Sequence, residues 1–86
     1  MALLEFYGEE CPHCIKMFEV SKKLAAETGL AFERNEVWHH PENEKKMEPL
    51  DHGRCGGVPF FINTDTDKFI CGEASYEELK NLAEGK

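Results

Sequence analysis

Two cysteines separated by two residues are the side chains of this sequence best suited to chemistry. Cys11 and Cys14 enclose Pro12 and His13, and a helix-like pattern follows them. Cysteines at this spacing can approach disulfide-bonding distance, and they can also supply two ligands to a metal ion. The pair could therefore be half of a metal site, a structural disulfide, or two thiols that open and close during a reaction.

A position at the start of a helix favours reactivity at Cys11. Unpaired backbone N–H groups and the positive end of the helix dipole both stabilise a thiolate there. Pro12 starts the helix without losing a hydrogen bond. We therefore predict Cys11 as the nucleophile and Cys14, one turn further along and more buried, as the resolving thiol.

Charged residues around the pair act in opposite directions. His13 stabilises the Cys11 thiolate, and a stabilised reduced form makes the disulfide more oxidising. Glu9 and Glu10 precede the pair and oppose the same thiolate by like charge. The sequence alone leaves this balance open.

The alternative of a metal site lacks a second ligand pair. Zinc sites use four ligands, often as two closely spaced pairs, and His39 and His40 are adjacent rather than at ligand spacing. We therefore expect no metal. Cys55 is interpreted as a free thiol in a glycine-rich loop, with a third redox thiol as the alternative, and Cys71 as a buried core cysteine.

The composition limits the class of protein. The chain has 86 residues, of which 41% are hydrophobic, and we expect one domain over residues 1–86. A net charge of −7 disfavours nucleic acid and anionic membranes as partners. The first residues lack the basic start and long apolar run of a signal peptide, so we expect a cytoplasmic location, where permanent disulfides are uncommon.

The first half of the chain reads as two strands and two helices. Ala2–Tyr7 is an apolar run typical of a buried strand, Cys14–Thr28 has helical periodicity, and Leu30–Trp38 alternates as a second strand. A further helix is expected to begin near Glu42 and to end or kink at Pro49. The apolar face predicted for the first helix contains Ile15, Phe18, Leu24 and Ala25.

The second half reads as a hairpin followed by a helix. Val58–Asn63 and Lys68–Cys71 are strands joined by a short turn. Ser75 and Glu78 form the pattern of a capping box at the start of a last helix, Tyr76–Glu84. The expected fold class is α/β, with a four-stranded mixed sheet flanked by three helices in the order βαβαββα.

Two landmarks in this order resemble the thioredoxin fold. They are the Cys-Pro-His-Cys segment directly after a strand and the Val58-Pro59 pair at the start of a later strand. In length and element order the chain resembles the minimal, glutaredoxin-sized form of that fold. The resemblance implies a thiol–disulfide oxidoreductase in which Val58-Pro59 is a cis peptide facing the cysteines. It also assigns Gly57, Val58 and Pro59 to substrate binding.

Glu5 is an acid within an otherwise apolar strand. It falls where thioredoxins, which this chain resembles, place a buried acid below the second cysteine. A buried carboxyl group has a raised pKa and can exchange a proton with the resolving thiol. The alternative is that Glu5 reaches solvent at the margin of the sheet.

The chain departs from the glutaredoxin pattern at positions linked to glutathione. Glutaredoxins usually carry a lysine three residues before the first cysteine, where this chain has Gly8. After the last strand they usually carry two glycines and an acid, where this chain has Gly72, Glu73 and Ala74. Cys-Pro-His-Cys itself also occurs in a family of strong protein-disulfide oxidases, which the chain resembles only in this segment.

The sequence therefore predicts an enzyme that exchanges a Cys11–Cys14 dithiol with protein or small-molecule disulfides. It requires no cofactor, and glutathione is one candidate reductant. The expected partners are protein disulfides and a thiol reductant system, and we expect a monomer. Two alternatives stay open: a metal-binding or redox-inert adaptor with this fold, and a glutathione-dependent glutaredoxin.

Overall fold

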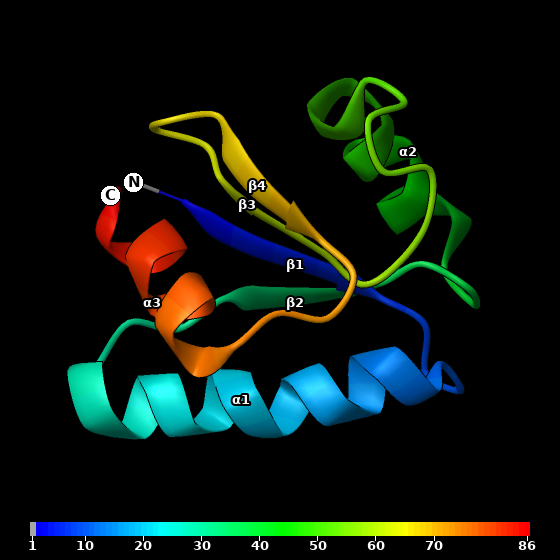
Figure 1. Cartoon of the computed structure of the whole chain (residues 1–86). Coiled ribbons are helices and arrows are strands. Elements are labelled where there is room, and N and C mark those ends of the chain that lie inside the picture. Colours follow the sequence, from blue (N-terminus) through cyan, green and yellow to red (C-terminus); the bar gives the residue numbers. More distant parts are fainter. Residues whose placement is uncertain (1) are drawn as a thin grey trace.

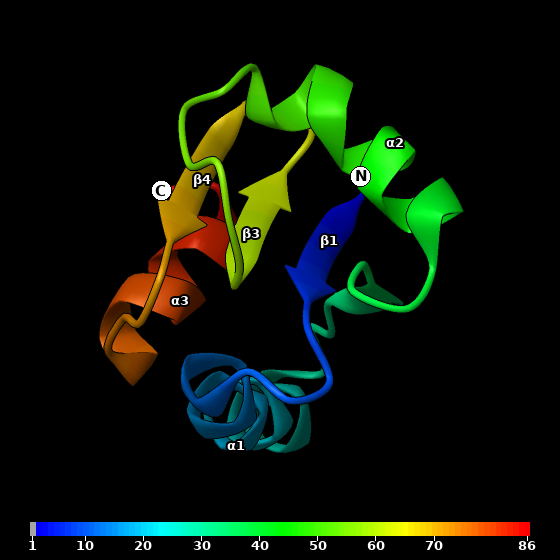
Figure 2. The ribbon, with the colours of Figure 1, turned by 90° about the vertical axis from the view of Figure 1, so that its right-hand side faces the viewer.

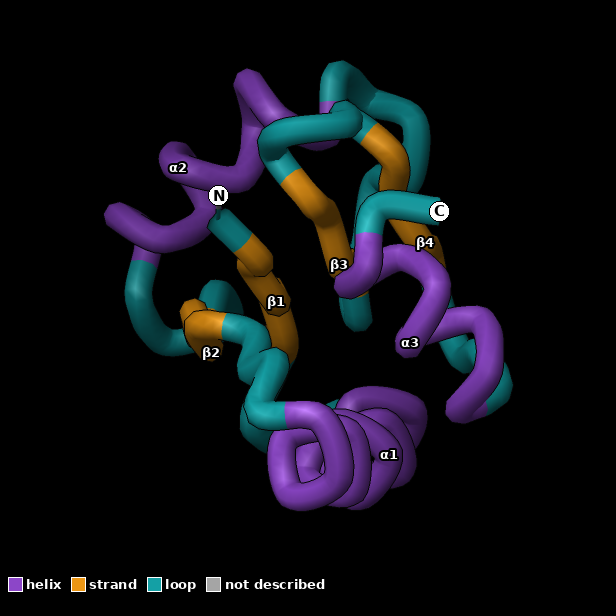
Figure 3. The backbone as a smooth tube through the Cα atoms, turned by 90° about the vertical axis from the view of Figure 1, so that its left-hand side faces the viewer, coloured by secondary structure: helices purple, strands orange, loops and turns teal. Residues whose placement is uncertain are grey.

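A four-stranded mixed sheet forms the centre of the computed structural model, which describes residues 2–86 (Figure 1). Its strands are β1 (Leu3–Tyr7), β2 (Glu33–Glu36), β3 (Phe60–Asn63) and β4 (Lys68–Cys71). They lie in the order β2-β1-β3-β4, which Figure 3 shows from one side to the other. The β1–β2 pair is parallel, and β3 is antiparallel to both β1 and β4. This confirms the α/β fold class expected from the sequence.

Three helices cover the two faces of the sheet. The helices α1 (Pro12–Thr28) and α3 (Tyr76–Glu84) lie on one face, and α2 (Pro41–Asp51) lies on the other (Figure 2). Alternate residues of a strand point to opposite faces. In β1, Leu3 packs in the core beside α1 and α3, whereas Leu4 packs in the core beside α2. Alternation therefore places Glu5 on the face covered by α1.

The helix α1 begins at Pro12, as predicted, and so includes two residues before the periodic segment Cys14–Thr28. Cys11 is the N-cap residue of this helix, with φ −76° and ψ 116°, and Pro12 takes the first helical position. The helix ends at Gly29, whose φ of +78° is the left-handed geometry that glycine adopts without steric cost.

The buried face of α1 differs from the expected one. The helix buries Cys14, Met17, Ser21 and Leu24, which lie three or four residues apart. Ile15, expected in the core, is 59% exposed. The prediction was wrong because it ranked positions by apolarity alone. Cys14 and Ser21 lie on the inner face of the helix, and Ile15 therefore lies on its outer face.

Two predicted strands are shorter in the structure by two residues or more. The strand predicted over Leu30–Trp38 is paired only from Glu33 to Glu36, because β2 is an edge strand and its sole partner, β1, has five residues. The strand predicted from Val58 begins at Phe60, since Pro59 has no N–H to donate to the ladder.

Pro49 does not end α2, although an end there was one of the two expected outcomes, and the other outcome, a kink, stays a prediction. The helix continues to Asp51 and is closed by His52, which has φ +53° and donates its N–H to the Glu48 carbonyl at 3.0 Å. The hydrogen bond that Pro49 cannot make would reach the carbonyl of Lys45. Both residues lie on the exposed side of the helix, where water can replace the bond.

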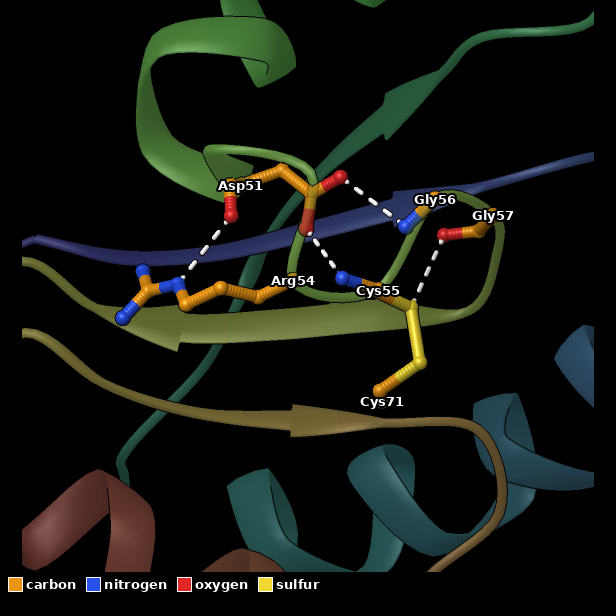
Figure 4. Close-up of a disulfide and its surroundings, with 6 residues drawn as sticks. All are labelled: Asp51, Arg54, Cys55, Gly56, Gly57 and Cys71. Atoms are coloured by element: carbon orange, nitrogen blue, oxygen red, sulfur yellow. Dashed lines mark hydrogen bonds between the residues drawn. A yellow bond between two sulfur atoms is a disulfide. The ribbon is translucent and has the colours of Figure 1, made fainter.

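Cys55 and Cys71 form a disulfide, with their Cα atoms 5.5 Å apart (Figure 4). The expectations of a free Cys55 and a core Cys71 were therefore wrong, and Cys71 is exposed. The physical reason is the register of the hairpin. Cys71 pairs with Phe60, which brings it beside the loop that precedes β3.

Within the described residues, no helix is long and apolar enough to cross a membrane. The longest of the described helices, α1, has 17 residues and is amphipathic, with its buried residues three or four positions apart on one face.

The predicted capping box is present at the start of α3. The Ser75 hydroxyl accepts a hydrogen bond from the Glu78 N–H at 3.1 Å, and the Glu78 carboxylate accepts one from the Ser75 N–H at 3.2 Å. We predict that Ser75→Ala lowers the free energy of unfolding by about 1 kcal/mol, measured by urea denaturation. Ser75→Thr is the matched control, because it keeps the hydroxyl. Equal stability of wild type and Ser75→Ala would show that the cap contributes nothing.

Candidate active site

The two motif cysteines lie where one end of the sheet meets the start of α1. Figure 1 shows the loops after β1, before β3 and after β4 converging at this end. The Cys11 N–H donates to the Gly8 carbonyl at 3.1 Å, which closes the turn between β1 and α1. The fold therefore brings Cys11, Cys14 and the Val58-Pro59 segment to the same edge.

The sulfur of Cys11 caps the helix. The Cys14 N–H donates to the Cys11 Sγ at 3.3 Å, and the Ile15 N–H donates to the Cys11 carbonyl at 3.0 Å. The sulfur thus occupies the acceptor position at the positive end of the helix dipole. Cys11 is 4% exposed and Cys14 is 1% exposed, so both sulfurs are more enclosed than a motif at an exposed helix start suggests.

Cys14 retains its proton strongly. Burial, a hydrogen bond with Cys11, and the negative charges of Cys11 and Glu5 raise the pKa of the Cys14 thiol to about 12. The two sulfurs are therefore inequivalent, and Cys14 needs a proton acceptor before it can act as a nucleophile.

Glu5 lies within the core and is fully buried. Neither of its carboxyl oxygens has a hydrogen-bond partner among the described residues, although the Arg34 Nε lies 3.4 Å from Oε1. Burial raises the pKa of Glu5, and the charge of Arg34 lowers it by less. The expectation that Glu5 lies buried near the second cysteine matches this geometry, and its catalytic role stays a prediction.

Arg34 is held in place by two aromatic rings. Its guanidinium carbon lies 3.9 Å from the ring centroid of Tyr7 and 4.0 Å from that of Phe18. These residues and Cys14 line a pocket of about 370 Å³ on the β2 side of α1. The sequence reasoning missed Arg34, because the contact depends on the parallel register of β1 and β2.

His13 contacts the loop that follows β4. Its Nδ1 pairs with the Glu73 carboxylate, and the Lys16 Nζ lies 3.7 Å from the same group. The hydrogen bond from His13 and the charge of Lys16 hold the pKa of Glu73 below its usual range, against a smaller upward effect of burial. Glu73 had been noted only as a departure from the glutaredoxin pattern. The structure places it against the motif.

Of the two acids before Cys11, Glu10 has a side-chain partner, whereas Glu9 is held through its backbone N–H. Glu10 contacts the His39 Nε2 at 2.8 Å. The buried Glu36 carboxylate accepts the N–H groups of Glu9 at 2.9 Å and of His39 at 2.7 Å. Burial tends to raise the pKa of Glu36, but these amides and the His39 charge together lower it. The carboxylates of Glu10 and Glu36 therefore hold the loop between β1 and α1 in place.

Gly8 is required by a close approach of Trp38. A side chain at this position would overlap the indole ring, with a built Cβ only 2.7 Å from its Cε3 atom. Trp38 is nevertheless 52% exposed, so its outer face lies open beside the motif. Gly8, which stands where glutaredoxins usually carry a lysine, thus leaves room for the indole ring of Trp38.

Potential metal ligands gather at one place within residues 2–86. Glu9, Glu10 and His39 can bring one ligand atom each within 4.8 Å of one another, and all three are exposed. Neither Cys11 nor Cys14 belongs to this group. The hypothesis that the cysteines form half of a metal site therefore gains no further ligands from the described residues.

The loop expected to bind substrate lies beside the motif. The Val58–Pro59 peptide bond is cis, as the resemblance implied, and Pro59 is buried. The Pro59 carbonyl accepts a hydrogen bond from the Gly72 N–H at 2.8 Å. Gly57 and Val58 line a pocket of about 320 Å³ together with Trp38 and residues of α2.

Comparison with solved structures identifies the family. The crystal structure of a glutaredoxin from Archaeoglobus fulgidus superimposes with a TM-score of 0.69 and 30% sequence identity. The match covers 99% of this chain and 89% of the other. This chain belongs to the glutaredoxin family. No protein-family model and no curated protein matches the sequence.

Within this family fold, the site has several charged groups around its cysteines. A histidine occupies the third position of its Cys-x-x-Cys segment, and an acid from the loop after β4 pairs with that histidine. Beneath the two cysteines, the buried Glu5 carboxyl group lies beside the Arg34 guanidinium. The family match supports the fold, and the charges around the cysteines come from His13, Glu73, Glu5 and Arg34.

The buried Glu5 predicts how stability depends on pH. A carboxyl group whose pKa is raised by folding binds its proton more tightly in the folded state, so stability falls as pH rises from the unfolded pKa through the folded one. We predict that Glu5→Gln removes this loss, so that the variant gains stability relative to wild type as pH rises, measured by urea denaturation. Glu33→Gln, at an exposed acid of β2, is the control. A wild-type stability that does not fall relative to Glu5→Gln would contradict the prediction.

Proposed function

We propose that this glutaredoxin-family protein is a dithiol oxidoreductase that exchanges Cys11–Cys14 with disulfides of other molecules. The observation that carries the proposal is the inequivalence of the two sulfurs. The Cys11 Sγ caps α1 and accepts the Cys14 N–H, whereas the Cys14 thiol has a pKa raised to about 12. A nucleophile and a proton-holding resolving thiol are the two components that dithiol exchange needs.

The reaction begins at Cys11. Its thiolate attacks one sulfur of the substrate disulfide, the substrate S–S bond breaks, and the leaving thiolate takes a proton from water. Cys14 then loses its proton and attacks the Cys11 sulfur of the mixed disulfide. The second substrate thiol leaves, and the substrate has gained two electrons from the Cys11–Cys14 pair.

Glu5 is the proposed acceptor of the Cys14 proton. Its charge contributes to the raised pKa of Cys14, which means that the two groups interact electrostatically. Its own raised pKa makes it a stronger base than an exposed glutamate. Arg34 stabilises the ionised form, so the carboxylate is available for this proton.

Substrates are proposed to be protein disulfides with apolar residues near the bond. The loop of Gly57, Val58 and Pro59 leads into β3 at the end of the sheet where the motif lies, and its backbone is the proposed site for main-chain recognition of a peptide. Two large apolar side chains, Ile15 at 59% and Trp38 at 52%, are exposed on residues that adjoin the motif. A net charge of −7 favours substrates that are not acidic.

Membership of the glutaredoxin family supports glutathione as the reductant that returns Cys11–Cys14 to the dithiol. A cytoplasmic location and a monomeric state stay predictions.

The resolving role of Cys14 is tested by removing its sulfur. We predict that Cys14→Ser accumulates a one-to-one mixed disulfide at Cys11 when mixed with a peptide disulfide, detected by intact mass and peptide mapping. Wild type should release the reduced peptide, and Cys11→Ser should form no such adduct. Turnover with glutathione that survives Cys14→Ser would replace the dithiol mechanism with a monothiol one. Absence of any adduct would favour a redox-inert adaptor.

The His13–Glu73 pair predicts a change in redox poise. Glu73→Gln leaves the positive charges near the motif without their carboxylate, which stabilises the Cys11 thiolate and therefore the reduced protein. We predict a less negative reduction potential for Cys11–Cys14, measured by equilibration with glutathione. Glu77→Gln, at another exposed acid in the first turn of α3, is the matched control. An unchanged or more negative potential in Glu73→Gln would contradict this account.

A further inference from the structure

The second cysteine pair, Cys55 and Cys71, takes no part in the proposed reaction. We propose that it is a reversible redox modification site whose reactants are small thiols and their disulfides, such as the two forms of glutathione. The disulfide holds the loop from Cys55 to Pro59, and its reduction releases that loop. The consequence for substrate binding rests on the proposed function, whereas the redox chemistry of the pair does not.

The bond joins two segments that lead into the active site. Cys55 precedes Pro59 by four residues, and Cys71 precedes Glu73 by two. The Gly72 N–H donates to the Pro59 carbonyl at 2.8 Å, and Glu73 pairs with His13 of the motif. A change at this bond therefore occurs beside both the substrate loop and the partner of His13.

Small thiols can reach this pair more readily than they can reach the motif. Cys71 is exposed and Cys55 is partly exposed, whereas Cys11 and Cys14 are 4% and 1% exposed. Thiol–disulfide exchange requires the attacking thiolate to contact a sulfur, so an exposed disulfide is open to attack by small thiols. The location favours a reactive bond over a permanent one.

The hairpin does not need the bond. The β3–β4 ladder already pairs Phe60 with Cys71 and continues to the Asn63–Lys68 pair. The segment whose position depends on the disulfide is therefore the loop before β3. Gly56, with φ +71°, and Gly57 lie in this loop, and no other atom lies within 4 Å of a Cβ built on either. Little side-chain packing holds these residues.

The base of the loop is held by other contacts. The buried Asp51 carboxylate accepts the Cys55 N–H at 2.6 Å and the Gly56 N–H at 3.0 Å (Figure 4). The Arg54 Nε donates to the Asp51 carbonyl at 3.0 Å. These bonds survive reduction, so release is expected to begin at Gly57 and extend toward Pro59 while α2 stays intact.

When Cys55 is reduced, its thiol proton has a hydrogen-bond acceptor nearby. The Cys55 Sγ lies 3.2 Å from the Gly57 carbonyl oxygen (Figure 4). A disulfide sulfur carries no proton, so this contact becomes a hydrogen bond only when Cys55 is a thiol. The loop therefore accommodates both redox states of Cys55.

Reduction uses two thiols and balances. One small thiolate attacks the Cys71 Sγ, the Cys55–Cys71 bond breaks, and Cys55 leaves and takes a proton. A second small thiolate attacks the small-molecule sulfur of the mixed disulfide, and Cys71 leaves and takes a proton. The products are two protein thiols and one small-molecule disulfide, and the reverse sequence restores the bond.

The test uses a chain in which only the second pair can react. The Cys11→Ser/Cys14→Ser variant is equilibrated in buffers of reduced and oxidised glutathione, alkylated, and mapped by mass spectrometry. We expect Cys55 and Cys71 to change together between disulfide and thiols, or to pass through a glutathione adduct at Cys71, while circular dichroism stays native. A pair that is reduced only when the chain is denatured would overturn the proposal. Because the motif cysteines are absent, failure of the dithiol reaction cannot affect this result.

The release of the loop is tested by hydrogen exchange. In the same variant, reduction should raise exchange several-fold at the amides of Gly57 and Val58 and at the Gly72 N–H, which donates to the Pro59 carbonyl, and should leave α1 unchanged. Equal protection of the loop in both redox states would overturn the switch. With wild-type motif cysteines, Cys55→Ser/Cys71→Ser should raise the KM for a peptide disulfide several-fold while the rate of Cys11 alkylation is unchanged. An unchanged KM would show that the bond does not control substrate binding.

Discussion

The contact between the Cys11 sulfur and the first turn of α1 is the interaction on which the site depends. The sulfur accepts the Cys14 N–H at the end of the helix where unpaired amides are concentrated. The strand, the turn and the side chain next to Cys11 maintain this geometry. The strand β1 ends at Tyr7, the turn from Gly8 closes onto Cys11, and the carboxylate of Glu36 holds the backbone of that turn. The helix thus makes one cysteine chemically different from the other.

A second constraint is the acid buried beneath the pair. Burying Glu5 costs folding free energy, since its oxygens have no hydrogen-bond partner among the described residues. Arg34 offsets part of this cost, and the rings of Tyr7 and Phe18 keep the guanidinium in place. A stability cost at this position is understandable if Glu5 receives the Cys14 proton. In the proposed exchange, the helix end acts on Cys11 in the first step and the buried acid acts on Cys14 in the second.

Local pattern predicted the fold and the motif, because strand alternation, helix caps and the Cys-x-x-Cys spacing act over a few residues. Ser75 and Glu78 formed the expected capping box, and the Val58–Pro59 bond is cis as the resemblance implied. Contacts between distant segments could not be predicted in this way. The Cys55–Cys71 disulfide depends on hairpin register, the Glu5–Arg34 pair on the parallel pairing of β1 with β2, and the His13–Glu73 pair on the loop after β4. Ile15 was misplaced because the inner face of α1 includes Cys14 and Ser21.

The central claim is that Cys11, whose sulfur caps α1, is the nucleophile of the exchange and that Cys14 is not. The most direct measurement is the rate at which iodoacetamide alkylates each cysteine of the reduced protein at neutral pH, mapped by mass spectrometry in wild type, Cys11→Ser and Cys14→Ser. The account predicts that Cys11 is alkylated first, that its fast reaction remains in Cys14→Ser, and that it is lost in Cys11→Ser. Equal rates at the two cysteines, or faster alkylation of Cys14, would contradict it.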